Sequence, residues 1–229
     1  MPTAHQRKTI ESELREYRKR YLRKEFSKLD ESATRIMVNS LLSEVLGYKE
    51  LEEIKTEYRI RGEYADYVIQ TKRKKRFVVE VKSIQLDLDD RHLRQSMSYA
   101  ANEGVDWILL LNGRSAELYR VIFGKPMRNI KVFSYDLTDL KQIKKVAESF
   151  AYLSKQSVNK GELEAYWKKF EALADASVTK LLYSEEVALY LRRQLKKETG
   201  LYFDLEEICV ALERVIMNSM DVNLRYKKK

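Results

Sequence analysis

The sequence predicts an α/β fold: a mixed sheet of four to six strands flanked by helices, followed by a helical C-terminal region. Short apolar runs rich in β-branched and aromatic residues recur between residues 65 and 137. The segments before and after them instead show the apolar spacing of helices. The chain has 229 residues, 44% of them hydrophobic, enough for a core domain at 1–137 and a helical region at 138–229.

The first helix is expected over residues 6–29. Its apolar face carries residues at i, i+3 and i+4 spacing, and Arg and Lys crowd the opposite face. The apolar residues are Ile10, Leu14, Tyr17, Tyr21, Leu22, Phe26 and Leu29. This pattern indicates an amphipathic basic helix that packs on the core.

A second helix is expected from Glu31 to the Gly47-Tyr48 pair. At 100° per residue, Glu31 falls on the apolar face and Glu44 falls outside it. A carboxylate on an apolar face needs a partner. Arg35, one turn further on, is one candidate for that partner.

The central feature is a hairpin that joins Ala65–Gln70 to Phe77–Lys82. Residues alternate faces along a strand, so Glu80 and Lys82 share a face, and the hairpin brings Asp66 opposite them. Two carboxylates this close favour a divalent cation, and oxygen ligands suit Mg²⁺ or Mn²⁺. We expect Asp66 and Glu80 to bind the metal, and Lys82 to orient or deprotonate a metal-bound water.

A basic run separates the two strands of this hairpin. Its members are Lys72, Arg73, Lys74, Lys75 and Arg76. We expect them to lie in the turn and bind phosphates near the site; a solvated turn is the alternative. The chain has 44 Lys and Arg against 35 Asp and Glu, a net charge of +9, which favours a nucleic-acid partner.

A helix is expected after the hairpin, where aspartates at 87, 89 and 90 provide N-cap residues. Gln95 and Tyr99 lie four residues apart, so the helix presents both on one face. An ordinary amphipathic helix with Tyr99 half in the core is the alternative. Apolar segments at 107–111, 117–120 and 133–137 are expected to form the remaining strands of the sheet.

These segments together resemble the PD-(D/E)xK nuclease superfamily. The residues that carry the resemblance are Ala65-Asp66, then Glu80-Val81-Lys82, then the Q-x-x-x-Y spacing of Gln95 and Tyr99. Ala65 stands where the superfamily usually has proline. The order of segments over about residues 31–137 is similar to the N-terminal nuclease domain of the type I restriction enzyme motor subunit.

The resemblance implies a restriction-endonuclease-like core and a Mg²⁺- or Mn²⁺-dependent endodeoxyribonuclease, in a restriction or defence system. It adds the Val81 carbonyl and Glu31 as candidate metal ligands, and makes Gln95 and Tyr99 candidate catalytic residues that brace the site. A catalytically silent nucleic-acid-binding or assembly subunit is the alternative. The sequence has no G-x-x-x-x-G-K-[S/T] loop, so ATP-dependent activity is not carried over.

The region after Thr138 is expected to form three or four helices. Ser184 caps a helix that ends near Gly200, and Asp204 with Glu207 forms a capping box. The last helix presents an apolar face for packing within the chain, for a homodimer or for docking to a larger complex. That face contains Leu205, Ile208, Leu212, Val215 and Ile216.

Other classes of protein are disfavoured by composition. A single cysteine, Cys209, excludes an intramolecular disulfide and a multi-cysteine zinc site, and two histidines are too few for His-ligand chemistry. There is no long uncharged apolar run and no signal-peptide pattern at the N-terminus. We therefore expect no membrane partner and a cytoplasmic location.

Overall fold

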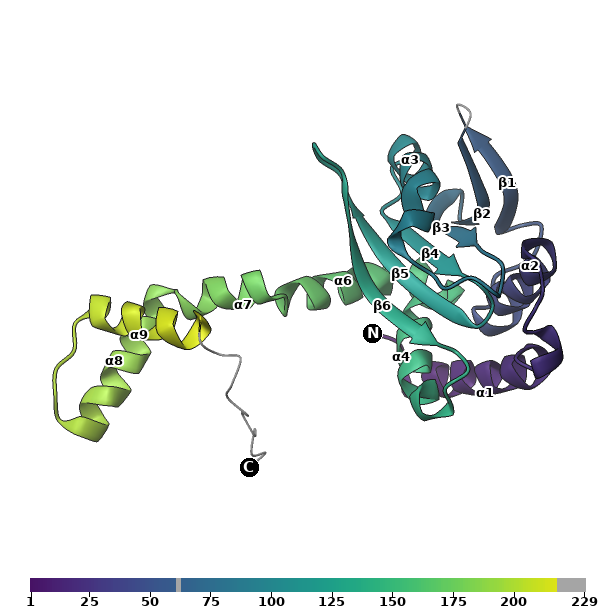
Figure 1. Cartoon of the computed structure of the whole chain (residues 1–229). Helices are drawn as coiled ribbons and strands as arrows, with labels where there is room; N and C mark the ends of the chain where they lie inside the picture. Colours follow the sequence, from purple (N-terminus) through teal and green to yellow (C-terminus); the bar gives the residue numbers. More distant parts are fainter. Residues whose placement is uncertain (61–62, 218–229) are drawn as a thin grey trace. The chain divides into compact units, whose positions relative to one another are not determined.

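Six strands form one mixed sheet, and helices precede, interrupt and follow it (Figure 1). The structure is a computed structural model that describes residues 1–60 and 63–217. The strands are β1 (Ile54–Ile60), β2 (Glu63–Thr71), β3 (Lys74–Val81), β4 (Trp107–Leu111), β5 (Ser115–Ile122) and β6 (Arg128–Asp136). The helices around the sheet are α1 (Ala4–Tyr21), η1 (Lys24–Phe26), α2 (Glu31–Ser40), η2 (Leu41–Val45), η3 (Asp90–Leu93), α3 (Arg94–Glu103), η4 (Leu140–Gln142), α4 (Ile143–Leu153) and α5 (Lys155–Asn159).

The strands lie in chain order, β1-β2-β3-β4-β5-β6. The β3–β4 pair is parallel and joined through α3, whereas every other pair is antiparallel. The predicted α/β architecture with a mixed sheet is confirmed. Strand β1 was not predicted, because an edge strand that includes Lys55, Glu57 and Arg59 has the charged composition by which sheets protect their edges.

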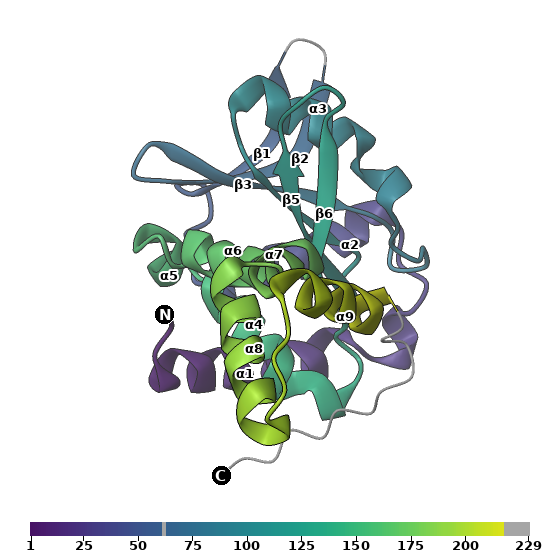
Figure 2. The ribbon, with the colours of Figure 1, turned by 90° about the vertical axis from the view of Figure 1, so that its left-hand side faces the viewer.

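Helices cover both faces of the sheet (Figures 1 and 2). On one face α3 packs over Val78, Ile108 and Leu110. The other face is covered by α2 and α4, and the rings of Phe133 and Phe150 lie 6.0 Å apart there. Helix α1 packs against α4. The face covered by α3 also carries Glu80, because strand alternation places Glu80 on the same side of β3 as Val78.

The turn of the β2–β3 hairpin consists of Lys72 and Arg73, with φ of 48° and 61°. Two-residue hairpin turns of this left-handed kind favour Asn and Gly, since side chains with a Cβ are strained there. Lys74, Lys75 and Arg76 belong to β3 instead. The prediction that the whole basic run lies in the turn is therefore wrong, because the tight turn accommodates only two residues.

The turn between β4 and β5 requires glycine. Gly113 has φ of 81°, and a Cβ at this position would lie 2.9 Å from the Met37 side chain. The carbonyl of Gly113 also accepts a hydrogen bond from the Tyr17 hydroxyl at 2.7 Å. The turn is thus held close to α1 and α2.

The N-terminal helix is shorter than predicted. Helix α1 ends at Tyr21, and Arg23 has an extended backbone, so residues 22–29 do not continue the helix. Arg18 anchors this end of α1, because its guanidinium donates to the carbonyls of Leu137 and Thr138. The predicted inward face is confirmed, with Ile10, Leu14 and Tyr17 buried.

The region after Thr138 contains more helices than the three or four predicted. Beyond α4 and α5 the structure describes α6 (Glu162–Ala172), α7 (Asp175–Leu182), α8 (Glu185–Thr199) and α9 (Leu205–Met217). The breaks between these helices are short and hardly disturb the apolar pattern, so the sequence did not reveal them. One such break is at Ser154, which caps α5. The predicted caps are confirmed, since Ser184 caps α8, Gly200 ends it, and Asp204 and Glu207 bond reciprocally.

The chain divides into two compact units, Met1–Tyr166 and Trp167–Lys229. The expected boundary at residue 137 falls between β6 and η4, and α4 and α5 lie in the first unit. In α9, Ile208 is buried whereas Val215 is 64% exposed. The sheet and the residues predicted to form the site all lie in the first unit.

Candidate active site

The hairpin brings the two predicted carboxylates together. Tyr67 pairs with Val79, so Asp66 lies beside Glu80 on neighbouring strands. One oxygen of Asp66 accepts a hydrogen bond from the Val81 backbone N–H at 2.7 Å. The Lys82 amine donates to Glu80 at 2.5 Å. The structure therefore places the two carboxylates and the lysine in one cluster.

Helix α2 contributes Arg35, which bridges two acids. Its guanidinium donates to Asp66 at 2.5 Å and to Glu31, one turn earlier, at 3.3 Å. Asp30 caps α2 by accepting from the Ala33 N–H, which sets where the helix starts. Of the two acids considered on the predicted helix, Glu31 on α2 is thus near the carboxylates, whereas Glu44 lies on η2. Glu44 pairs with Arg20 instead, at 2.8 Å.

Helix α3 contributes Ser96, whose hydroxyl donates to the second oxygen of Glu80. Sequence reasoning missed this residue. A signal was present, because Ser96 and Ala100 lie four residues apart on the buried side of α3. A polar group on such a face needs a hydrogen-bond partner.

Burial raises the pKa of Glu80, and the charge of Asp66 adds to this, while the hydrogen bonds from Lys82 and Ser96 act in the opposite direction. Burial lowers the pKa of Lys82, but the hydrogen bond and charge of Glu80, with the charges of Glu31 and Asp66, outweigh burial and raise it. Lys82 is therefore a cation at neutral pH. A cationic lysine suits orienting a water or binding an oxyanion, rather than accepting a proton.

The raised pKa of Glu80 predicts that the metal-free protein loses stability as the pH rises from about 4.5. The folded protein keeps the Glu80 proton where the unfolded chain has already lost it, so stability falls as pH rises through this window, by about 1.4 kcal/mol per pH unit at most. We expect the Tm of the wild type in EDTA to fall relative to that of Glu80→Gln as the pH rises above about 4.5. Parallel pH profiles of the two proteins would contradict this.

The two candidate residues on α3 separate in the structure. Gln95 is exposed and lines a cavity of 510 Å³ together with Glu80 and Lys82. Tyr99 is fully buried in the core under the sheet, and the Lys75 amine lies 5.9 Å from its ring centroid. Helical spacing alone put both near the site, but packing of α3 on the sheet turns Tyr99 into the core. Its role in the site stays a prediction.

The basic run lies away from the carboxylates. Lys72 and Arg73 form the turn at one end of the hairpin, and Glu80 lies at the other end of β3. Glu80 follows Lys74 by six residues along the strand, a distance of roughly 20 Å. The run therefore begins at the opposite end of the hairpin from Glu80, and phosphate binding by it stays a prediction.

Two residues of the run have partners within the chain. Lys75 forms an ion pair with Glu103 on α3. Arg76 donates to the hydroxyl of Thr71 and to Asn159. These contacts give both a structural role in joining β3 to its neighbours.

The donor set fits a hard divalent cation in its chemistry. Asp66 and Glu80 supply carboxylate oxygens, and the Val81 carbonyl follows directly in the chain. With Glu31, three carboxylates face the two cations Arg35 and Lys82, which leaves one formal negative charge. Within residues 1–60 and 63–217, however, no three Asp, Glu, His or Cys side chains converge closely enough to hold a metal. Asp66 is hydrogen-bonded to Arg35 and Glu80 to Lys82, so an ion held by both carboxylates would compete with these two contacts.

A second buried glutamate lies in the same row of the sheet. Leu110 pairs with both Glu80 and Glu117, so the two glutamates are two strands apart on the same face, roughly 10 Å from each other. Glu117 accepts from Ser134 at 2.7 Å, from Lys131 at 3.1 Å and from the Tyr119 hydroxyl. Unlike Glu80, it has three donors and no neighbouring carboxylate on an adjacent strand, which suits a structural role.

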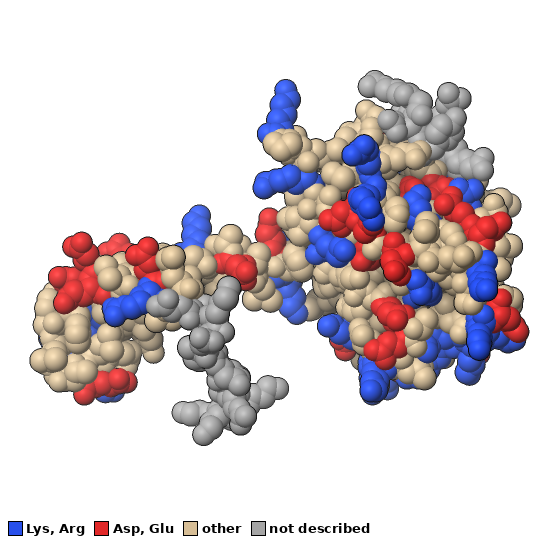
Figure 3. Space-filling model, in the orientation of Figure 1, with Lys and Arg blue, Asp and Glu red and all other residues tan. Residues whose placement is uncertain are grey.

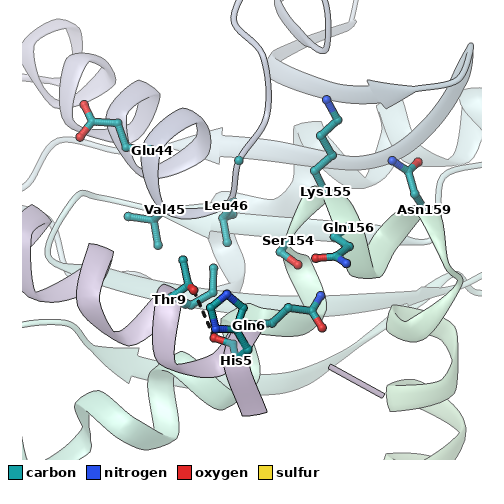
Figure 4. A pocket seen from close by; sticks show the side chains of 12 residues that line it. His5, Gln6, Thr9, Glu44, Val45, Leu46, Ser154, Lys155, Gln156 and Asn159 are labelled. Carbon is teal, nitrogen blue, oxygen red and sulfur yellow. Dashed lines mark hydrogen bonds between the residues drawn. The ribbon is translucent and has the colours of Figure 1, made fainter. Parts of the chain in front are cut away.

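A cavity of 480 Å³ lies elsewhere, between α1, the end of η2 and α5 (Figure 4). The two charged side chains that line it point away from the others in the figure, and both are paired: Glu44 with Arg20, and Lys155 with Glu53. None of the predicted site residues lines this cavity. It is therefore not part of the carboxylate cluster.

The segment that builds the carboxylate cluster also matches a protein-family model. Residues 30–132 match the family model described as type I restriction enzyme R protein N terminus (HSDR_N). The match links this chain to type I restriction enzymes. It covers α2 through most of β6, including every carboxylate of the cluster, but neither α1 nor the helices after β6.

Two other comparisons gave no match, one with curated proteins and one with solved structures. Among the helices that the structure describes, none is both long and apolar enough to cross a membrane.

Proposed function

We propose that this chain is a metal-dependent nuclease of the PD-(D/E)xK superfamily, with a restriction-endonuclease-like core, acting on DNA in a restriction or defence system. The observation that carries the proposal is the convergence of Asp66, Glu80 and Lys82 on one hairpin, within the segment similar to a type I restriction enzyme R protein. Carboxylates and a lysine in this arrangement serve phosphodiester hydrolysis.

In this proposal, Asp66 and Glu80 hold Mg²⁺ or Mn²⁺, with the Val81 carbonyl and Glu31 as further ligands. The ion, when bound, supplies charge stabilisation at the phosphate and an acidified water. Lys82, as a cation, orients the attacking water or contacts a phosphate oxygen. Gln95, which lines the same cavity, contacts the substrate backbone. Arg35 positions Asp66 through the hydrogen bond between them.

The charge distribution supports a nucleic-acid substrate for the first unit. Residues 1–166 carry 32 Lys and Arg against 25 Asp and Glu, whereas residues 167–229 carry 12 against 10. Figure 3 shows basic and acidic side chains interleaved over the visible face of the first unit. Binding on this visible face would rest on local groups of cations rather than on one large basic patch.

We also propose that the C-terminal helices form a homodimer or dock to a larger complex. The second unit exposes several apolar side chains, including Leu181 (64%), Tyr202 (69%) and Val215 (64%). Exposed apolar groups of this kind are typical of surfaces that a partner covers.

Incubation of the purified chain with supercoiled plasmid, linear duplex and single strands tests the proposal. We expect cleavage with Mn²⁺ or Mg²⁺ and none with EDTA, because the carboxylates need the ion to act. Intact DNA under every condition, with binding retained, would instead favour the catalytically silent binding or assembly subunit.

A further inference from the structure

Two cavities meet at the junction of η3 and α3. The first, of 510 Å³, contains Glu80 and Lys82, and the second, of 670 Å³, extends to Met127 in the loop between β5 and β6. Arg91 and Arg94 line both cavities. The two arginines therefore stand between the carboxylate cluster and the β5–β6 loop.

Arg94 is exposed, and the described part of the chain offers it neither a hydrogen bond to its side chain nor an ion pair. The cations nearer the carboxylates are already paired, Arg35 with Asp66 and Lys82 with Glu80. Arg91 is only partly available to a ligand: its side chain is 90% exposed, but it donates to Asp89 at 2.6 Å. A free guanidinium beside a cluster of acids has its five donors available for an external anion.

We propose that Arg94, assisted by Arg91, binds the phosphodiester backbone of DNA next to the scissile phosphate. This rests on the proposed nuclease function. The strand enters the cavity of Glu80 and Lys82 and continues past the arginines into the second cavity. The surface differs from the basic run of the hairpin, which lies at the far end of β3.

Electrostatics gives the reason for cations at this position. The acids of the cluster repel a phosphate, so a backbone that approaches Glu80 needs compensating positive charge close by. Guanidinium binds phosphate oxygens through two parallel hydrogen bonds, an arrangement that lysine does not reproduce. Contacts of this kind position the strand and carry no sequence information.

Binding is measured by fluorescence anisotropy with a labelled duplex in EDTA, using Glu80→Gln as the background so that cleavage cannot interfere. Arg94→Ser and Arg91→Ser are compared with Arg7→Ser on α1, another exposed arginine whose side chain has no hydrogen bond in the described structure. All three variants remove one positive charge, so they separate position from net charge. Arg94→Lys tests whether the guanidinium itself matters.

We expect Arg94→Ser to raise the Kd about 10-fold and to reduce the log-log salt slope by about one unit, as for one lost phosphate contact. Arg91→Ser should have a smaller effect, because Asp89 already occupies part of its guanidinium. Arg94→Lys should keep the salt slope but bind more weakly than the parent, and Arg7→Ser should change the Kd less than about 2-fold.

Equal weakening by Arg94→Ser and Arg7→Ser would overturn the inference in favour of a net-charge effect. Unchanged binding by Arg94→Ser, or no binding of DNA by the parent at the lowest salt, would also overturn it. Equal weakening and unchanged binding both leave the proposed nuclease function intact, because the cleavage assay of the wild type decides it separately. A parent that binds no DNA would also count against DNA as the substrate.

Discussion

Replacing Glu80 with Gln is expected to reduce metal-dependent DNA cleavage at least about 100-fold while the protein stays folded. The substitution keeps the shape of the side chain and its hydrogen bond with Ser96, but removes the charge that a divalent ion needs. Lys82→Met should have a similar effect on cleavage, because the group that orients the water is lost. Single-turnover cleavage in Mn²⁺ measures both.

Glu44→Gln is the matched control for these variants. Glu44 belongs to the same first unit, but it pairs with Arg20 away from the cluster. It should cleave at the wild-type rate, and circular dichroism should show all three variants folded. Cleavage by Glu80→Gln and Lys82→Met at the wild-type rate would remove the basis for the proposed active site.

Glu117→Ala is expected to lower the free energy of unfolding by about 2–4 kcal/mol. Glu117 is 4% exposed and accepts from Tyr119, Lys131 and Ser134, so its loss removes one acceptor from each of these donors, of which Tyr119 still has Asp90 at 2.9 Å. Tyr119 joins Glu117 and Asp90 in one hydrogen-bond network, and burial together with these two hydrogen bonds raises the pKa of the Tyr119 hydroxyl. Denaturant unfolding followed by fluorescence measures the loss.

Ser134→Ala is the control for this prediction, because it removes only one donor from Glu117, at a cost of about 1 kcal/mol. Under conditions where Glu117→Ala remains folded, the Glu117→Ala protein should still cleave DNA, whereas Glu80→Gln should not. A stable but inactive Glu117→Ala would show that this second glutamate serves the site and not the fold.

The contrast between these two glutamates shows where sequence reasoning ends. Both lie in apolar strands and both are buried. The E-x-K spacing singled out Glu80, and strand alternation correctly placed Lys82 beside it. The Glu117 cluster was not recognised, because two of its three donors, Lys131 and Ser134, come from β6 and its neighbour Asp90 comes from η3, at positions with no regular spacing from Glu117 in the chain.

Local patterns carried most of the fold. Alternation of apolar residues predicted the β2–β3 hairpin, helical spacing predicted the buried face of α1, and capping residues predicted the limits of α8. These features depend on residues a few positions apart, whose geometry is set by backbone periodicity. The convergence of Asp66 with Glu80 belongs with them, since a hairpin joins strands that follow each other directly.

Contacts between distant segments required the tertiary structure. Arg35 reaches Asp66, Ser96 reaches Glu80, and the packing of α3 turns Tyr99 into the core while leaving Gln95 and Arg94 exposed. The periodicity of a single element gives the direction of each side chain but not which element will lie opposite it. The register and packing of separate elements decide that, and with it which charges near the carboxylates are neutralised and which stay available to a ligand.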